Sequence, residues 1–237
     1  MLKEFVEKLL SLAPINLATV NGLTYTDTVL HLVSPPVLAK VPLLTLTGLV
    51  DLIQHKLDAL NVDGWLLHVS SHTDVSLVSR NTDEHGRRVL LAQSHLDDGT
   101  PFPFGRFINR EEFVIGLQSQ FVQNDDQQGI VKLCSNLEAS TVAMAEDDGV
   151  SQRTTVKQGV TLKETVTVKG RVSLKPYRTF REIEQPASAF IFRLRSKDGA
   201  VPECALFEAD GGKWKLDAVL AIKTWLDAKN LGMPVIA

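Results

Sequence analysis

The residue types best suited to hold a charged partner are concentrated between Ser151 and Arg181. This interval contains eight basic residues and one acidic residue, Glu164, so its net charge is +7. The whole chain of 237 residues carries −3, and the remaining residues therefore carry −10. Such a segregation of charge indicates a surface that attracts anions. The basic residues are Arg153, Lys157, Lys163, Lys169, Arg171, Lys175, Arg178 and Arg181.

Aromatic rings and further arginines accompany these cations. Tyr177 and Phe180 lie inside the interval, and Arg193 and Arg195 share one face of a predicted strand after it. Cations neutralise phosphates, and aromatic rings stack on bases with ~1–3 kcal/mol per base, so the pattern is typical of proteins that bind single-stranded nucleic acid. The residues predicted to bind a ligand are Lys163, Lys169, Arg171, Lys175, Tyr177, Arg178, Phe180, Arg181, Arg193 and Arg195.

The same basic interval is also compatible with three different roles. Arginine side chains could hold a small nucleotide through paired N–H donors. The interval could instead be a subunit interface, at which it meets the acidic remainder of a second copy. It could also be a solvated β-ribbon, whose lysines discourage pairing between exposed strand edges. Charge patterning alone does not separate these alternatives.

A second constellation, His68, Ser70, His72 and Asp74, is the best enzyme candidate. On a strand these alternate residues would share one face, where His68, His72 and Asp74 could ligate a metal ion or form a base with an orienting carboxylate. A solvent-facing strand edge accounts for the same alternation. The chain has no phosphate-binding glycine loop, no Cys-x-x-Cys and no Gly-x-Ser-x-Gly. We therefore favour a non-enzymatic protein and predict no cofactor.

The elements that must position these residues are of mixed type. Apolar residues at helical spacing predict four helices. The first is at 46–60, with Thr45 as its N-cap, and the second follows Asn109, which forms a capping box with Glu112. The third follows Gly129, and the fourth is at 214–229. Alternation predicts a hairpin of strands 65–78 and 88–92, a second hairpin of 190–195 with 205–208, and a long ribbon at about 141–175. An aromatic-rich turn lies at 97–105. The expected fold class is α+β, with mixed or antiparallel sheets, flanking helices and a projecting β-ribbon.

The expected organisation is an N-terminal α+β portion, 1–100, and a C-terminal α+β portion, 101–237, unless the two form one continuous domain. The pattern at residues 2–10 is that of an amphipathic helix and not of a signal peptide, and no stretch has the ~18–20 apolar residues of a membrane span. We therefore expect a cytoplasmic protein with no membrane partner. Cys134 and Cys204 are expected to be small buried hydrophobes, although a disulfide stays open.

A family resemblance rests on short segments of the second half. They are FGRFI at 104–108, the helix around Glu112 and Phe113, DDGVSQ at 147–152, LKPYRTF at 174–180, QPAS at 185–188, FIFR at 190–193 and LFEADGGKW at 206–214. Over about residues 100–230 they resemble the YfdQ-like family of bacteriophage and prophage proteins, with a looser match at LTGLV, 46–50. The resemblance implies a phage protein made in the bacterial cytoplasm, and it brings no catalytic residues.

Phage proteins of this kind commonly handle DNA or interfere with host defence, so the resemblance leaves two functions open. The first is an oligomeric protein that holds single-stranded nucleic acid on the basic ribbon. The second is a counter-defence protein that sequesters a nucleotide signal or binds a host protein. We also expect a homo-oligomer, because a projecting ribbon that cannot bury its own apolar face usually packs on a neighbour.

Overall fold

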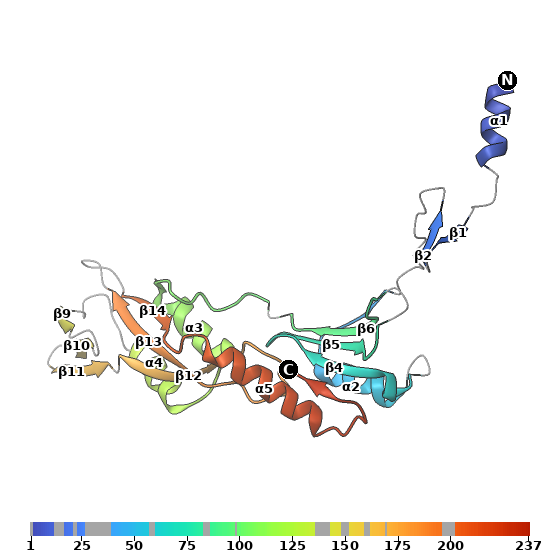
Figure 1. Cartoon of the computed structure of the whole chain (residues 1–237). Helices are drawn as coiled ribbons and strands as arrows, with labels where there is room; N and C mark the ends of the chain where they lie inside the picture. Colours follow the sequence, from blue (N-terminus) through green and yellow to red (C-terminus); the bar gives the residue numbers. More distant parts are fainter. Residues whose placement is uncertain are drawn as a thin grey trace. The chain divides into compact units, whose positions relative to one another are not determined.

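The structure is a computed structural model of the chain that describes residues 2–11, 17–20, 23–26, 39–56, 60–82, 86–97, 99–135, 143–147, 152–158, 162–168, 170–195 and 202–237. The chain divides into two compact units, Met1–Val37 and Leu38–Ala237. The first unit contains helix α1 (Leu2–Ser11) and an antiparallel pair of strands, β1 (Leu17–Val20) and β2 (Leu23–Thr26). The second unit contains the elements around the candidate site (Figure 1).

The first large sheet of this unit is mixed, with strand order β15-β4-β5-β6-β3. Its core is β4 (Trp65–Val69), β5 (Asp74–Ser79) and β6 (Leu90–His95), which are antiparallel. The edge strands β15 (Val235–Ile236) and β3 (Val41–Leu43) run parallel to β4 and β6. Helix α2 (Leu46–Gln54) packs on β3 and β6, and α5 (Lys213–Asp227) packs on β4 and β15. The 3-10 turn η2 (Val62–Gly64) directly precedes β4 in the chain.

The second large sheet is antiparallel throughout, in the order β7-β14-β13-β12-β8. It consists of β7 (Ile108–Asn109), β14 (Glu203–Glu208), β13 (Ser188–Arg195), β12 (Arg171–Pro176) and β8 (Phe121–Val122). Helix α3 (Arg110–Gln120) packs on β14, and α4 (Asp125–Ser135) packs on β12. Phe113, Phe190 and Phe192 are fully buried between these layers.

A third sheet lies within the predicted ribbon of about 141–175, but the last residues of that range form β12 of the second sheet instead. Strands β9 (Ala143–Asp147), β10 (Gln152–Gln158) and β11 (Leu162–Val168) pair antiparallel in the order β11-β10-β9. Within the described strands, neither of the two five-stranded sheets is hydrogen-bonded to this sheet. The expected α+β fold class is thereby confirmed.

Local sequence signals account for several boundaries. Thr45 caps α2, since its Oγ1 accepts a hydrogen bond from the backbone N–H of Gly48 at 3.0 Å. Asn109 caps α3 as predicted, because its Oδ1 accepts from the N–H of Glu112 at 2.8 Å. The Glu112 carboxylate reaches back to the cap residue and accepts from the side-chain Nδ2 of Asn109 at 3.1 Å. The second predicted hairpin also forms, with Phe192 opposite Leu206.

The expected boundary between the N-terminal and C-terminal portions, at residue 100, falls inside the second unit. The two portions share one sheet there, because C-terminal elements complete the first large sheet. Strand β15 supplies its edge, and Ile222 and Leu226 of α5 belong to the same core as Leu67 and Leu77. In Figure 1 the red C-terminal strand and the teal strand β4 therefore lie side by side although they are far apart in the sequence.

The connection from β12 to β13, residues 177–187, joins the two cores. It starts in the second sheet, inserts Phe180 and Ile183 into the core under the first sheet, and then returns. Phe180 is 0% exposed. Its predicted role as a stacking residue is therefore wrong, since a ring enclosed in the core offers no face to a ligand.

The described helices include none that is long and apolar enough to cross a membrane.

The position of Phe180 predicts a large loss of stability on truncation. Phe180→Ala should lower the free energy of unfolding by ~3–5 kcal/mol, since it leaves a cavity in the shared core. The matched control, Tyr177→Ala, removes a ring that is 36% exposed and should cost much less. Urea unfolding of both variants checks this. Equal losses in the two variants would contradict the assignment of Phe180 to the core.

Candidate anion-binding pocket

A pocket of about 290 Å³ lies where the 100–104 turn, the 177–187 connection and the start of α5 meet. Its wall contains three permanent positive charges and one negative charge, together with several aromatic rings. The lining residues are His72, Thr100, Pro101, Phe102, Phe104, Ser119, Gln120, Pro176, Tyr177, Arg178, Arg181, Glu208, Trp214 and Lys215. Cationic and aromatic groups in one concave site suit a flat, anionic ligand.

Arg178 is the most enclosed cation of the pocket, with a side chain only 12% exposed. Its guanidinium lies 3.7 Å from the centroid of the Trp214 ring and within 6 Å of the Phe104 and Phe190 rings. It forms an ion pair with Glu208 and donates to Ser188 Oγ at 2.5 Å. Burial lowers the pKa of Arg178 to about 10, against the opposing effect of Glu208 and Asp210, so the side chain is still charged at neutral pH.

Trp214, at the start of α5, forms the wall against which Arg178 packs. It is 5% exposed, and its Nε1–H is buried with no hydrogen-bond partner among the described residues. His72 stands edge-on to its ring, with the ring centroids 4.7 Å apart. A buried N–H without an acceptor costs about 1–3 kcal/mol.

The rim of the pocket carries the more accessible cations. Arg181 is exposed and lies 4.1 Å from the centroid of the Tyr177 ring, and Tyr177 is itself partly exposed. Lys215 is exposed beside Trp214. These groups can reach an anion at the pocket mouth without leaving their aromatic neighbours.

The backbone that carries Tyr177, Arg178 and Arg181 is fixed by one buried amide. Gln185, 4% exposed, accepts from the N–H of Arg178 at 3.1 Å and of Thr179 at 3.3 Å, and it donates to the carbonyl of Phe180 at 2.9 Å. Thr179 Oγ1 donates to the carbonyl of His72 at 2.6 Å. These hydrogen bonds therefore fix the 177–187 connection and join it to the backbone at His72, another residue of the pocket wall.

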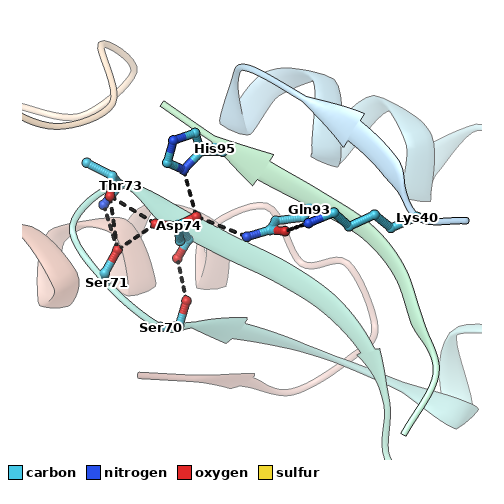
Figure 2. A network of polar contacts seen from close by, with 7 residues as sticks. All are labelled: Lys40, Ser70, Ser71, Thr73, Asp74, Gln93 and His95. Atoms are coloured by element: carbon cyan, nitrogen blue, oxygen red, sulfur yellow. Dashed lines mark hydrogen bonds and ion pairs between the residues drawn. The ribbon is translucent and has the colours of Figure 1, made fainter. Parts of the chain in front are cut away.

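A polar network centred on Asp74 holds the turn that carries His72 (Figure 2). Oδ1 of Asp74 lies 2.8 Å from His95 Nδ1 and accepts from Gln93 Nε2 at 3.0 Å. Oδ2 accepts from the hydroxyls of Ser71 and Thr73, each at 3.0 Å. Because Ser71 and Thr73 flank His72, this carboxylate fixes the turn on both sides of it.

The predicted polar strand face, His68, Ser70, His72 and Asp74, does not form. The chain turns at 70–73 between β4 and β5, so the alternation does not continue along one strand. His68 is exposed opposite Ser76, His72 faces Trp214, and Asp74 contacts His95. Among the described residues, no group of three or more His, Cys, Asp or Glu side chains could hold a metal ion. The predicted metal alternative at His68, His72 and Asp74 is therefore wrong.

Of the ten predicted ligand-binding residues, the structure brings Tyr177, Arg178 and Arg181 together in the pocket. Lys175 and Arg195 lie outside the pocket. Lys175 forms an ion pair with Glu184, and Arg195 forms one with Glu203 at 2.6 Å. Arg171 is exposed on β12 and donates to the Ala209 carbonyl at 3.5 Å, and half-buried Arg193 on β13 donates to the Phe192 carbonyl at 3.3 Å. Lys163 lies on β11, and Lys169 lies outside the described residues.

Sequence reasoning misses Trp214 and His72 as members of the pocket. Trp214 follows the turn Asp210-Gly211-Gly212 and has the pattern of the first residue of an amphipathic helix, and nothing in a helical pattern indicates a contact with Arg178. The aromatic-rich turn at 97–105 is the one available signal, since it supplies Phe102 and Phe104 to the wall.

Comparisons with protein-family models, with curated proteins and with solved structures found no match to this chain. The resemblance to the YfdQ-like family stays a prediction.

The Asp74 network predicts a pH-dependent stability. Burial alone would raise the pKa of Asp74, but hydrogen bonds from His95, Thr73 and Ser71 outweigh it, so the pKa lies below its ordinary value of 3.8. The folded state thus favours the carboxylate, and its contribution is present above pH 3.8 and is lost as pH falls through the lowered pKa. Wild type should be more stable than Asp74→Asn at about pH 6, and this difference should shrink at about pH 3 in urea unfolding. A difference that does not change with pH would contradict the role of the ionised carboxylate.

Proposed function

We propose that this protein is a non-enzymatic binding protein whose pocket at Arg178 holds a nucleotide, that is, a phosphate-bearing ligand with a flat ring. The observation that carries the proposal is a concave site in which the nearly enclosed guanidinium of Arg178 packs against Trp214 and the exposed cations Arg181 and Lys215 also line the wall. Cations and aromatic rings in one concave site favour an anionic ligand that carries a flat ring.

The charges of the pocket support an anion. Arg178, Arg181 and Lys215 line it against a single carboxylate among the described lining residues, Glu208. Arg178 is already paired with Glu208, so Arg181 and Lys215 are the cations best placed to meet a phosphate. A guanidinium suits this role because it can donate two parallel hydrogen bonds to phosphate oxygens.

The size of the pocket favours a small ligand over a long strand. Its volume of about 290 Å³ lies just below the roughly 300–1,000 Å³ typical of ligand sites. Lys175 and Arg195, which a long phosphate track along 171–195 would need, are paired with carboxylates of their own chain. A nucleotide signal captured by a phage counter-defence protein fits both facts, and the family resemblance agrees with that setting.

A thermal-shift panel tests this proposal, with mononucleotides, cyclic dinucleotides and inorganic phosphate as probes. A ligand at a hundredfold excess over its Kd stabilises the fold by about 2.7 kcal/mol. For a chain of this size, that raises Tm by roughly 5–10 °C. Arg181→Ala should weaken binding about tenfold or more. Lys132→Ala, which removes one exposed charge from α4 outside the pocket, should bind as wild type does.

Arg181 is the better target because removal of Arg178 would leave Glu208 without its partner and empty the space against Trp214. No shift with any nucleotide, or equal weakening by Arg181→Ala and Lys132→Ala, would count against the pocket.

A second candidate, single-stranded nucleic acid bound by the ribbon, is favoured by the register of β10 and β11. Arg153 pairs with Thr167, Thr155 with Thr165, and Lys157 with Lys163. The register thus pairs three basic positions, 153, 157 and 163, with one another or with threonine positions of the neighbouring strand.

The salt dependence of oligonucleotide binding tests this second candidate. Neutralising Arg153, Lys157 and Lys163 to Gln should reduce the slope of log K against log salt by about 2, at ~0.7 for each phosphate contact on a single strand. Neutralising the exposed lysines Lys56, Lys132 and Lys229 removes the same charge elsewhere and should leave most of the slope. Equal slopes for the two triple variants would show that only net charge matters and would remove the ribbon as a site.

A further inference from the structure

The two cysteines of the chain meet inside the second core. Cys134 lies on α4 and Cys204 on β14, 70 positions apart in the sequence, and their Sγ atoms are 3.7 Å apart. Both residues are 0% exposed. Their spacing forms no sequence motif, so only the packing of α4 against this sheet brings them together.

The neighbourhood of the two thiols is apolar. They belong to the cluster that contains Leu117, Ile130 and Leu194, and the charged group that acts on Cys134 among the described residues is Arg110 of α3. Neither cysteine lines the pocket at Arg178. A role for the pair is therefore independent of any ligand bound there.

We propose that Cys134 and Cys204 are a covalent modification site, at which the chain forms an intramolecular disulfide that links α4 to β14. The sulfur atoms are at van der Waals contact, so small side-chain and backbone adjustments bring them to the ~2.05 Å of a disulfide. No other cysteine competes, since the sequence contains only these two.

The reaction is thiol–disulfide exchange with a small-molecule disulfide such as oxidised glutathione. One cysteine thiolate attacks the reagent, whose S–S bond breaks and releases one glutathione thiolate. The second cysteine thiolate then attacks the mixed disulfide, and a second glutathione leaves. The two protons of the cysteines pass to the two leaving thiolates, and the protein loses the two electrons that the reagent gains.

The surroundings of the pair make this exchange slow in the fully folded protein. The hydrogen bond with Cys204 and then burial raise the pKa of Cys134 well above its ordinary value, so little thiolate forms. Exchange must therefore await a local opening of α4 from the sheet. Mild urea, below the unfolding transition, should increase the rate of closure severalfold.

The disulfide should stabilise the fold because it closes a loop of 70 residues. Loops of this length restrict the unfolded chain strongly. In a chain of this size the expected rise in Tm is roughly 5 °C or more. The oxidised protein should also resist proteolysis near Cys134, at the end of α4.

The test incubates the whole protein with oxidised glutathione, with and without mild urea, then unfolds it in acid and alkylates free thiols. Mass spectrometry should show a product that takes no alkylating reagent, with one peptide containing Cys134 joined to one containing Cys204. Cys134→Ser and Cys204→Ser each keep one thiol, and should give only the mixed disulfide with glutathione.

Two results would overturn the proposal. In the first, the wild-type protein equilibrates to free thiols or mixed disulfides with no internal bond, even in mild urea. In the second, the internal bond forms but Tm falls, which would mean that the native packing of α4 on β14 excludes it. Nucleotide binding plays no part in either readout, so this test is separate from that of the pocket.

Discussion

The pocket depends on the side-chain amide of Gln185, which is buried in the core. The 177–187 connection leaves one sheet, contributes Phe180 to the core of the other, and returns, so its backbone lacks the pairing that a strand would give. Buried backbone groups must be paired, and an unpaired one costs about 1–3 kcal/mol. Gln185 meets this need for Arg178, Thr179 and Phe180 together. The side chains of Arg178 and Arg181 take their places because that backbone is fixed.

The guanidinium of Arg178 is nearly enclosed, and its charge can still act on a ligand in the pocket. Its guanidinium is stabilised by Glu208 on β14, by the faces of Trp214 and Phe190, and by Ser188. These partners come from two strands and a helix, so the cation also joins the elements of the pocket to one another. An anion that enters meets a charge whose orientation is already set, which lowers the entropic cost of binding.

Local features of the fold could be predicted from the sequence, and the pocket could be predicted only in part. Thr45 and Asn109 are recognisable as caps because a cap depends on residues within one helical turn. The cations of the pocket at 178 and 181 could be found because charge is visible in sequence. The contact of Trp214 with Arg178 joins positions that no periodicity relates.

Two predictions failed because a turn of the backbone redirects the side chains. The polar strand breaks at 70–73, where Asp74 bonds to Ser71 and Thr73, and strand alternation cannot show this. Phe180 lies inside the basic interval, which predicts a ring that stacks on a ligand, but the 177–187 connection turns it into the core. In both cases the outcome depends on contacts with residues far along the chain or on hydrogen bonds that compete with the strand pattern.

The net charge of a sequence interval and the net charge of the surface that its residues form lead to different expectations about the ligand. The interval from Ser151 to Arg181 carries +7 in sequence, yet Lys175 and Arg178 meet Glu184 and Glu208, which lie beyond its end. Pairing of this kind removes most of the attraction that these residues would exert on a distant polyanion, because a dipole's field falls off faster than that of a charge. Within the walls of the pocket the balance is still positive, and a low-dielectric concavity strengthens it. A compact anion is therefore a better match for the described residues than an extended nucleic-acid strand along 171–195.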